Sequence, residues 1–248
     1  MMELLKIEGI GKKFCKKLHL SLWYGFKDLF AFKPTTSLRK DEQWALDNIN
    51  ITISEGEFIG ILGKNGSGKS TLVRIIIGIY KSTVGTIQTH CSIIPLFLSN
   101  LALNRFYSGL DNYYFMGAIL GISRTELNKR IPVLKSFSGL GEDIYASIGT
   151  YSSGMRIRMR FGAVKAIDPG MIIIDEALSV SDEQFQNQCF NYLKEFSKTK
   201  AVVFISHDLA VMEKYCNRII VMKNGMIQLD STNVKESILY YVNSELDN

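Results

Sequence analysis

Cysteine and histidine are scarce in this chain, and neither is arranged as a metal site. The 248 residues include four cysteines, which lie far apart without a C-x-x-C pair, and three histidines that form no ligand cluster. This pattern argues against a disulfide framework and against a structural zinc site, because both need several such side chains at short, regular spacings. The cysteines are typical of reduced, mostly packed thiols in a cytosolic protein.

Long apolar runs are missing as well. No segment approaches the ~18 consecutive apolar residues that a membrane-spanning helix needs, so we expect any membrane role to depend on a partner or a surface contact. Internal repeats and low-complexity stretches are also absent. The rest of the composition, 46% hydrophobic and 21% charged with a net charge of +5, is that of an ordinary globular protein. The small basic excess suits an anionic partner without proving one.

Residues 63–71 carry the strongest functional signal. They fit the phosphate-binding pattern G-x-x-x-x-G-K-[ST]. The apolar run 58–62 before them predicts a buried strand, and residues 72–77 after them predict a packed helix. In that context, successive amide groups and the helix dipole face one anion. The pattern predicts binding of a nucleoside triphosphate, with Lys69 on the β- and γ-phosphates and the Ser70 hydroxyl on Mg²⁺. The predicted phosphate-binding residues are Gly63, Asn65, Gly66, Ser67, Gly68, Lys69, Ser70 and Thr71.

The order of predicted strands and helices indicates the fold class. Two segments alternate in polarity and predict strands: 3–10 is typical of an edge strand, and 46–53 alternates more cleanly. Three continuous apolar segments predict central strands covered on both faces, 171–174, 201–205 and 218–222. A helix is predicted over 183–197, and helical patterns from residue 92 onward indicate an inserted helical subdomain. Strands that alternate with helices predict an α/β core with a mainly parallel sheet.

Two of the central strands end in side chains that suit nucleotide chemistry. Asp175 and Glu176 follow the strand 171–174; Asp175 can hold Mg²⁺, and Glu176 can orient and deprotonate an attacking water. An acidic turn after a strand is common, so this match gains its weight from the phosphate loop upstream. His207 follows the strand 201–205, where it can donate a hydrogen bond to the γ-phosphate; the alternative is a histidine that only caps the strand end.

A serine-rich turn precedes an arginine-rich helix at Tyr151-Ser152-Ser153-Gly154-Met155. Its hydroxyls and free N–H groups suit an anion, although by itself the turn cannot be told from ordinary N-capping. The order of phosphate loop, helical insert, serine turn, strand-Asp-Glu and strand-Ser-His resembles the ATP-binding cassette (ABC) ATPases over most of residues 3–230. The serine turn looks like the signature motif of that family.

The resemblance implies an α/β P-loop NTPase, the ABC nucleotide-binding domain, with a mainly parallel core and an antiparallel β edge. Residues 1–248 would form one ATPase domain, with a helical subdomain at about 92–160. It also implies a head-to-tail homodimer in which Ser152, Ser153 and Gly154 complete the ATP site of the partner. Asp182 resembles an aspartate that bridges the two subunits, and Phe14 matches an aromatic ring that stacks on adenine. ATP and Mg²⁺ are the implied cofactors, and Glu176, His207 and Lys69 the implied catalytic residues.

Residues 151–155 differ from the usual signature motif, and this difference indicates a particular branch of the family. Tyr-Ser-Ser-Gly-Met at 151–155, together with Ser108-Gly109-Leu110-Asp111-Asn112, is similar to ATPase subunits of bacterial polysaccharide exporters for O-antigen, capsule or teichoic acid. This implies ATP hydrolysis that powers export of a lipid-linked polymer, on the cytoplasmic face of the bacterial inner membrane and bound to separate permease subunits. An exporter of lipids or small molecules is the alternative. A non-transport ABC ATPase acting on the ribosome or on DNA is less favoured, because the chain has one cassette and no heptad run; no nucleic-acid partner is expected.

Two features stay open at this stage. The glutamine that ABC ATPases usually carry near the start of the helical insert is missing, and Asn100 or Asn104 is the candidate substitute. The N-terminal insert at about 15–43 has apolar residues at helical spacing with lysines nearby. It is either an amphipathic helix at the membrane or permease, or a helix that covers the sheet of the ATPase itself.

Overall fold

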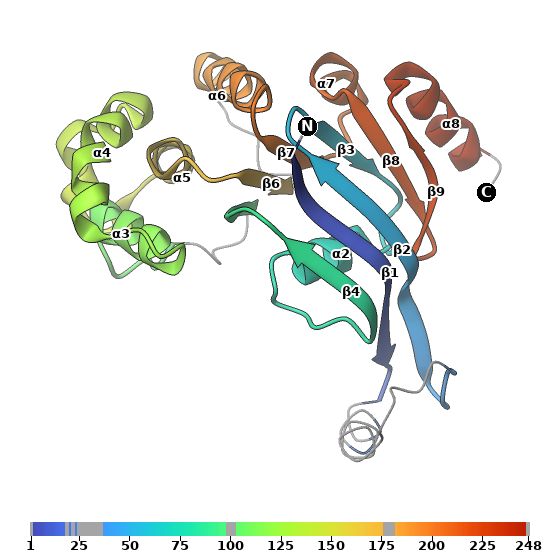
Figure 1. Ribbon diagram of the computed structural model, residues 1–248. Helices are drawn as coiled ribbons and strands as arrows, with labels where there is room; N and C mark the ends of the chain where they lie inside the picture. The colour runs from blue at the N-terminus through green and yellow to red at the C-terminus, as the bar shows by residue number, and fades with distance from the viewer. Residues whose placement is uncertain are drawn as a thin grey trace. The chain divides into compact units, whose positions relative to one another are not determined.

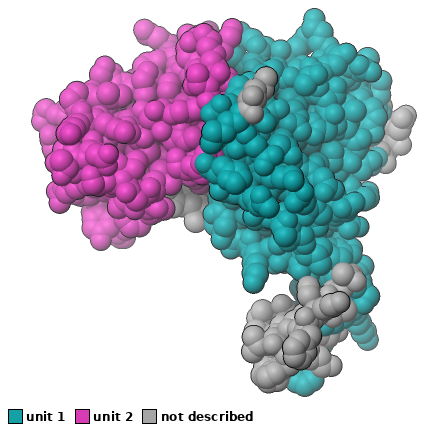
Figure 2. Space-filling model, viewed as in Figure 1, with its two compact units in different colours: residues 1–90, 203–248 teal, residues 91–202 magenta. Residues whose placement is uncertain are grey.

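Two compact units make up the described chain. The computed structural model describes residues 2–17, 20, 23, 37–97, 103–175 and 182–246. Unit 1 comprises residues 1–90 and 203–248, and unit 2 comprises residues 91–202 (Figure 2). None of the described helices is long and apolar enough to cross a bilayer.

Unit 1 begins with an antiparallel three-stranded sheet in which β1 lies between β2 and β4 (Figure 1). The central pairs are apolar, with Ile7 opposite both Ile51 and Ile87. The alternation predicted for 46–53 is confirmed, since the four apolar side chains of this segment are buried while Asn48, Asn50 and Thr52 are exposed. The prediction of an edge strand at 3–10 is wrong, because β1 pairs with β2 on one side and with β4 on the other. Its apolar side chains are buried, and among their neighbours only Glu8 is exposed. The strands are β1 (Glu3–Cys15), β2 (Glu42–Ser54) and β4 (Val84–Thr89).

A second group of strands in unit 1 carries the phosphate loop. The five residues of β3 (Phe58–Leu62) are all buried, as their continuous apolar run predicts. β3 pairs in parallel with β8 (Arg218–Lys223), and β8 pairs antiparallel with β9 (Met226–Ser231). β7 (Ala201–Ile205) is the other neighbour of β3 in the sheet order.

The described part of unit 1 also contains the helices α2, α7 and α8. α2 (Lys69–Ile76) buries Leu72, Val73 and Ile75 and ends before Gly78, whose φ of 76° is the left-handed conformation that terminates helices. α7 (Leu209–Tyr215) follows β7, and α8 (Val234–Leu246) lies against β8 and β9 (Figure 1).

Unit 2 is mostly helical around one parallel strand pair. β5 (Ile93–Phe97) pairs in parallel with β6 (Met171–Asp175). α4 packs against α5, and Leu127, Leu134 and Phe161 on these helices are buried. The helices are α3 (Gly109–Ile119), α4 (Arg124–Ser138), α5 (Ser153–Ile167) and α6 (Glu183–Phe196), with the 3₁₀ turns η2 (Gly141–Tyr145) and η3 (Ile148–Thr150).

The predicted elements agree with these observations apart from their ends. β1 and β2 are longer than predicted, because their pairing continues through Lys13 opposite Trp44 and Phe14 opposite Gln43, where side-chain polarity no longer alternates. Both strands therefore extend into the predicted insert at 15–43. Residues 18–19, 21–22 and 24–36 of that insert lie outside the described residues, so its two interpretations remain predictions.

Candidate functional site

The backbone of the phosphate loop adopts conformations that favour glycine. Gly63, Gly66 and Gly68 have φ values of 154°, 83° and 106°. A Cβ at Gly63 would lie 2.4 Å from the carbonyl oxygen of Met222, and one at Gly68 would lie 2.8 Å from that of Ala45. Side chains at the first and third glycines would therefore collide with neighbouring backbone, which explains their presence in physical terms.

The β8–β9 turn supports the loop from one side. The Ser67 amide donates to the Lys64 carbonyl at 3.1 Å, which closes a tight turn within the loop. The Gly225 amide donates to the Ser67 carbonyl at 3.0 Å, and the Asp47 amide donates to the Gly225 carbonyl at 2.9 Å. These three bonds link the loop to β2 and to the hairpin, and so hold its shape.

The ammonium of Lys69 is held against the loop backbone. Its side chain is 9% exposed, and Nζ donates to the carbonyl oxygens of Gly63 and Lys64, the latter at 3.0 Å. The charge therefore lies at the start of the loop. This is where a lysine must be to reach the phosphates that the loop amides bind.

Two features of the phosphate loop leave hydrogen-bond donors available to an anion: the Ser67 hydroxyl and the N-terminus of α2. Ser67 is 5% exposed, and its hydroxyl has no hydrogen-bond partner within the described chain. That oxygen would lie 2.5 Å from a Cβ at Gly63, so it points toward the start of the loop. α2 begins at Lys69 without a side-chain cap and without an acidic residue in its first turn. Its first N–H groups and its dipole are thus available to a phosphate.

The other predicted loop residues lie on the surface of unit 1. Asn65, Gly66 and Ser70 are exposed, and Thr71 is half-buried. A pocket of about 400 Å³ opens beside the first half of the loop, with α8 contributing its far wall. His207 is exposed and follows β7, the strand beside β3, by two residues. The loop and His207 therefore follow neighbouring strands of one unit.

Phe14 lies close to the phosphate loop along the sheet. It pairs with Gln43 of β2, and two residues further along that strand Ala45 abuts Gly68. Since a strand rises about 3.3 Å per residue, Phe14 lies roughly 7 Å along the sheet from that contact and one strand across. The half-buried ring is thus within unit 1 and beside the loop.

In unit 2, the serine turn forms the N-terminus of α5. The Ser152 hydroxyl caps the helix by accepting a hydrogen bond from the Met155 amide at 3.1 Å, while Ser152 and Ser153 are exposed and Gly154 is half-buried. Tyr151 before it is buried, and its hydroxyl donates to the Asp143 carbonyl at 2.5 Å. Burial raises the pKa of Tyr151, so this hydroxyl stays protonated and anchors the turn to η2.

The acidic residues that the sequence assigns to the site in unit 2 lie at two different places. Asp175 is the half-buried last residue of β6, opposite Phe97 of β5, and Glu176 lies outside the described residues. Asp182 caps α6 through the Phe185 amide at 3.1 Å and forms an ion pair with Arg158 of α5. The Phe185 N–H first, and Arg158 second, hold the pKa of this carboxyl below its ordinary value.

Sequence reasoning missed Arg158, whose guanidinium also lies 4.3 Å from the ring centroid of Phe185. It joins the helix of the serine turn to the start of α6. Of the candidates for the missing glutamine, Asn100 lies outside the described residues, and the side-chain oxygen of Asn104 accepts a hydrogen bond from the Phe106 amide at 3.0 Å. Asn104 therefore stabilises a local turn.

Comparison with known proteins places these features in a family. The profile of the ABC transporter family matches residues 46–179. Teichoic acids export ATP-binding protein TagH of Bacillus anthracis is 34% identical over 96% of this chain, which spans 42% of that relative's length. O-antigen export system ATP-binding protein RfbB of Klebsiella pneumoniae is 33% identical over 82% of this chain and 84% of its own. The chain spans less than half the length of some curated relatives, and most of others.

Solved structures agree on the fold. A dimeric ATP-binding cassette in a post-hydrolysis state, bound to ADP and Pi, superposes with a TM-score of 0.70 at 22% identity, covering 92% of this chain and 98% of its own. The ADP conformation of another ATP-binding cassette of an ABC transporter gives a TM-score of 0.72 at 22% identity, with both chains fully covered. The predicted fold class, an α/β P-loop nucleotide-binding domain with antiparallel strands and a helical part, is confirmed.

Proposed function

The chain belongs to the ABC transporter family, and we propose that it is the ATP-hydrolysing subunit of a bacterial exporter for a lipid-linked polysaccharide or teichoic acid. The observation that carries the nucleotide part is the phosphate loop. There the Ser67 hydroxyl is buried without a hydrogen-bond partner among the described residues, and the Lys69 ammonium is held at the loop's start. The polymer part is supported by the names of relatives from Bacillus anthracis and Klebsiella pneumoniae.

The loop residues would bind and orient the triphosphate. Amides of residues 63–71 and the N-terminus of α2 would neutralise the β- and γ-phosphates together with Lys69, so that catalysis is mostly positioning and charge stabilisation. Phe14 would stack on the adenine. Glu176 would take a proton from the attacking water, and His207 would donate to the γ-phosphate.

Mg²⁺ fits the available donors. The Ser70 hydroxyl and the Asp175 carboxylate are hard oxygen ligands of the kind this ion prefers, and it usually takes only one or two of them beside substrate phosphates. When bound, the ion would neutralise charge on the phosphates.

The second half of each ATP site would come from a second copy of the chain. The exposed start of α5, with Ser152, Ser153 and Gly154, offers the hydroxyls, N–H groups and dipole that a γ-phosphate needs. Asp182 would lie at the junction of the two copies. Its ion pair with Arg158 would keep the start of α5 and the start of α6 moving together.

An apolar surface on unit 2 supports a permease partner. Phe115 and Ile119 lie one turn apart on α3 and are 62% and 69% exposed, and Phe106 just before the helix is 84% exposed. Tyr107 is also exposed, as is Tyr145, whose neighbour Ala146 accepts a hydrogen bond from the Gly109 amide at the start of α3. Large apolar side chains gathered on the surface in this way are typical of protein–protein contacts. The subunit would thus bind peripherally at the cytoplasmic face of the membrane.

Paired substitutions test the chemistry. Lys69→Ala should lose both ATP binding and hydrolysis, whereas Glu176→Gln should bind ATP and accumulate as an ATP-bound dimer with phosphate release reduced at least about 100-fold, in the range typical of general-base loss. Glu183→Gln, on an exposed glutamate at the start of α6, is the matched control. Wild-type phosphate release by Glu176→Gln would remove that residue from its role.

The transport part needs a separate experiment. A tagged full-length chain should copurify with an integral membrane permease, and Glu176→Gln expressed in place of the wild type should leave lipid-linked polymer inside the cell. Substituting Phe115 and Ile119 by serine should reduce copurification and leave ATP hydrolysis by the isolated subunit intact. Copurification with a permease but no retained polymer would favour another exported substrate.

A further inference from the structure

A cluster of two aromatic rings and one ammonium lies at the end of β1. The ring centroids of Phe14 and Tyr80 are 5.6 Å apart with planes inclined at 72°, an edge-to-face pair. The Lys12 ammonium lies 5.3 Å from the Phe14 centroid and 5.9 Å from that of Tyr80, within the range of a cation–π contact. We call Lys12, Phe14 and Tyr80 the aromatic–lysine cluster.

Hydrogen bonds fix the cluster to the loop that follows α2. Lys12 Nζ donates to the Lys81 carbonyl at 2.8 Å, and burial lowers the pKa of this ammonium. The Thr83 amide donates to the Gly11 carbonyl at 2.8 Å. The loop is thereby attached to β1 at two residues just after Tyr80, Lys81 and Thr83, so Tyr80 is presented to the Phe14 ring by a defined backbone.

The same loop is connected to the phosphate site through α2. This helix carries Lys69 in its first turn and Arg74 in its last. The Tyr80 amide donates to the Arg74 carbonyl at 2.9 Å, and the Arg74 guanidinium lies 5.6 Å from the Tyr80 centroid. Phe14 itself pairs with Gln43, two residues from the strand segment that abuts the loop. The aromatic–lysine cluster is thus connected to the phosphate loop in two ways, through α2 and through the sheet.

We propose that Tyr80 and Lys12 are positioning residues that hold the Phe14 ring in the orientation needed to stack on the nucleotide base. An isolated phenylalanine at a strand end would rotate about its side-chain torsions, and that freedom would be lost on binding. The edge of Tyr80 and the ammonium of Lys12 restrict it beforehand, which favours binding. This inference rests on the adenine-stacking role of Phe14 given under the proposed function.

The test separates binding of the base from binding of the phosphates. The full-length protein and its variants are titrated with ATP and, in parallel, with tripolyphosphate, which has no base. Tyr80→Ala should weaken ATP binding by about 2- to 10-fold, the range of one edge-to-face contact, and leave tripolyphosphate binding unchanged. Tyr80→Phe keeps the ring and should behave as the wild type.

Controls and a double-mutant cycle make the role specific. Tyr114→Ala removes another half-buried tyrosine with an arginine at 4.7 Å from its ring, in unit 2, and should change neither affinity. If Tyr80 acts through Phe14, Tyr80→Ala should have no further effect on ATP affinity in a Phe14→Ala background. Additive effects, or equal weakening of ATP and tripolyphosphate, would overturn the inference.

The outcomes also separate this inference from the proposal on which it rests. If Phe14→Ala leaves ATP affinity unchanged, the stacking role of Phe14 fails and the positioning role fails with it. If Phe14→Ala weakens ATP binding selectively but Tyr80→Ala does not, only the positioning role of Tyr80 is overturned.

Discussion

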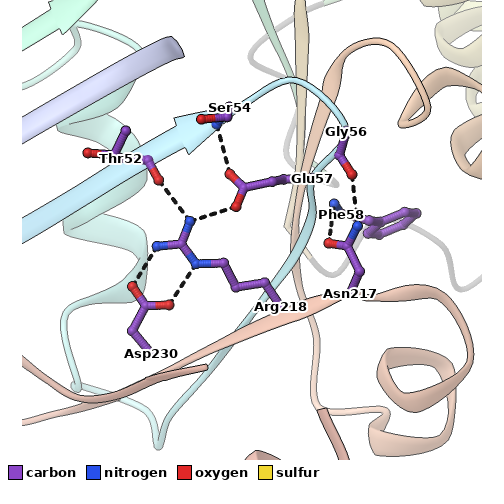
Figure 3. A network of polar contacts seen from close by, with 8 residues as sticks. All are labelled: Thr52, Ser54, Gly56, Glu57, Phe58, Asn217, Arg218 and Asp230. Carbon is purple, nitrogen blue, oxygen red and sulfur yellow. Dashed lines mark hydrogen bonds and ion pairs between the residues drawn. The ribbon is translucent and has the colours of Figure 1, made fainter. Parts of the chain in front are cut away.

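Arg218 of β8 connects three strands of unit 1 and the turn before β3 at the end opposite the phosphate loop, and its removal has a calculable effect. Its guanidinium binds the Asp230 carboxylate through two bonds of 2.7 and 2.6 Å, and donates to Glu57 and to the Thr52 carbonyl, each at 2.8 Å (Figure 3). The Arg218 side chain is 16% exposed. The carboxylates raise the pKa of Arg218, first of all through the hydrogen bonds to Asp230, so its charge persists at every accessible pH.

Arg218→Ala should destabilise the protein by about 2–4 kcal/mol. Removing one partner of a buried ion pair costs about 3–5 kcal/mol, because the remaining charge stays without compensation. Here the Asp230 side chain is 28% exposed, so water replaces part of the lost interaction and reduces that figure. For a chain of this size, each kcal/mol shifts the melting temperature by roughly 2–4 °C, which gives an expected decrease of about 5–15 °C.

Thermal unfolding followed by circular dichroism measures this shift. Lys198→Ala is the control, because Lys198 pairs with Glu195 at 2.7 Å on an exposed surface, where such a pair contributes about 0–1 kcal/mol. ATP affinity of folded Arg218→Ala should match the wild type, since the network lies at the amino ends of β3 and β8. A melting temperature within about 2 °C of the wild type would refute the reasoning that these carboxylates depend on Arg218.

Three further outcomes follow from local structure. Ser67→Ala should leave unfolding free energy unchanged or raise it by about 1 kcal/mol, since it removes an unsatisfied buried hydroxyl, while ATP affinity measured by titration falls several-fold. Gly117→Val should lower unfolding free energy by about 1–3 kcal/mol, measured by urea titration, because a Cβ there would lie 2.5 Å from both methyl carbons of Leu127. Burial raises the pKa of Cys189 and of Cys216 to about 12; a colorimetric thiol reagent at pH 7.5 should therefore modify at most two of the four thiols until urea is added.

The parts of the fold that could be predicted are those set by local chemistry. β3 was predicted over 58–62 and is found there, because a fully apolar run between a turn and a glycine-rich loop has few other ways to be buried. The helix predicted over 183–197 is found at Glu183–Phe196, since its apolar positions repeat with the helical period. The phosphate loop was predictable for a similar reason, since its first and third glycines, Gly63 and Gly68, meet backbone that admits no side chain.

The parts that could not be predicted depend on contacts between distant residues. Nothing near Arg158 in the sequence indicates that it pairs with Asp182, 24 positions away. The same holds for Tyr80 and Phe14, which meet only because the loop after α2 returns to β1. The catalytic, metal and partner-site assignments rest on resemblance and stay predictions.

One segment was assigned by resemblance and has a local physical role as well. Residues 108–112 were matched to an element of polysaccharide exporters. In the structure, Ser108 and Asp111 form a capping box at the start of α3. Asn112 is 1% exposed, and its amide group donates to the carbonyls of Asn104 and Ser108 at 3.0 and 2.8 Å. A buried asparagine that ties a loop to a helix start gives a structural reason for this pattern, independent of any transported substrate.

Polar side chains at the two ends of the β3–β8 pair differ in whether they have hydrogen-bond partners within the described residues. At the amino ends, Arg218, Glu57 and Asn217 all have hydrogen-bond partners. At the carboxyl end, the Ser67 hydroxyl is buried without one, and Gly63 is in a conformation that favours glycine. An unsatisfied buried hydroxyl costs about 1–3 kcal/mol, similar to the stabilisation that we expect from Arg218. The stabilisation at the Arg218 end of the sheet can therefore offset the cost of leaving the Ser67 hydroxyl without a hydrogen bond at the other end. A bound phosphate can supply that missing hydrogen bond.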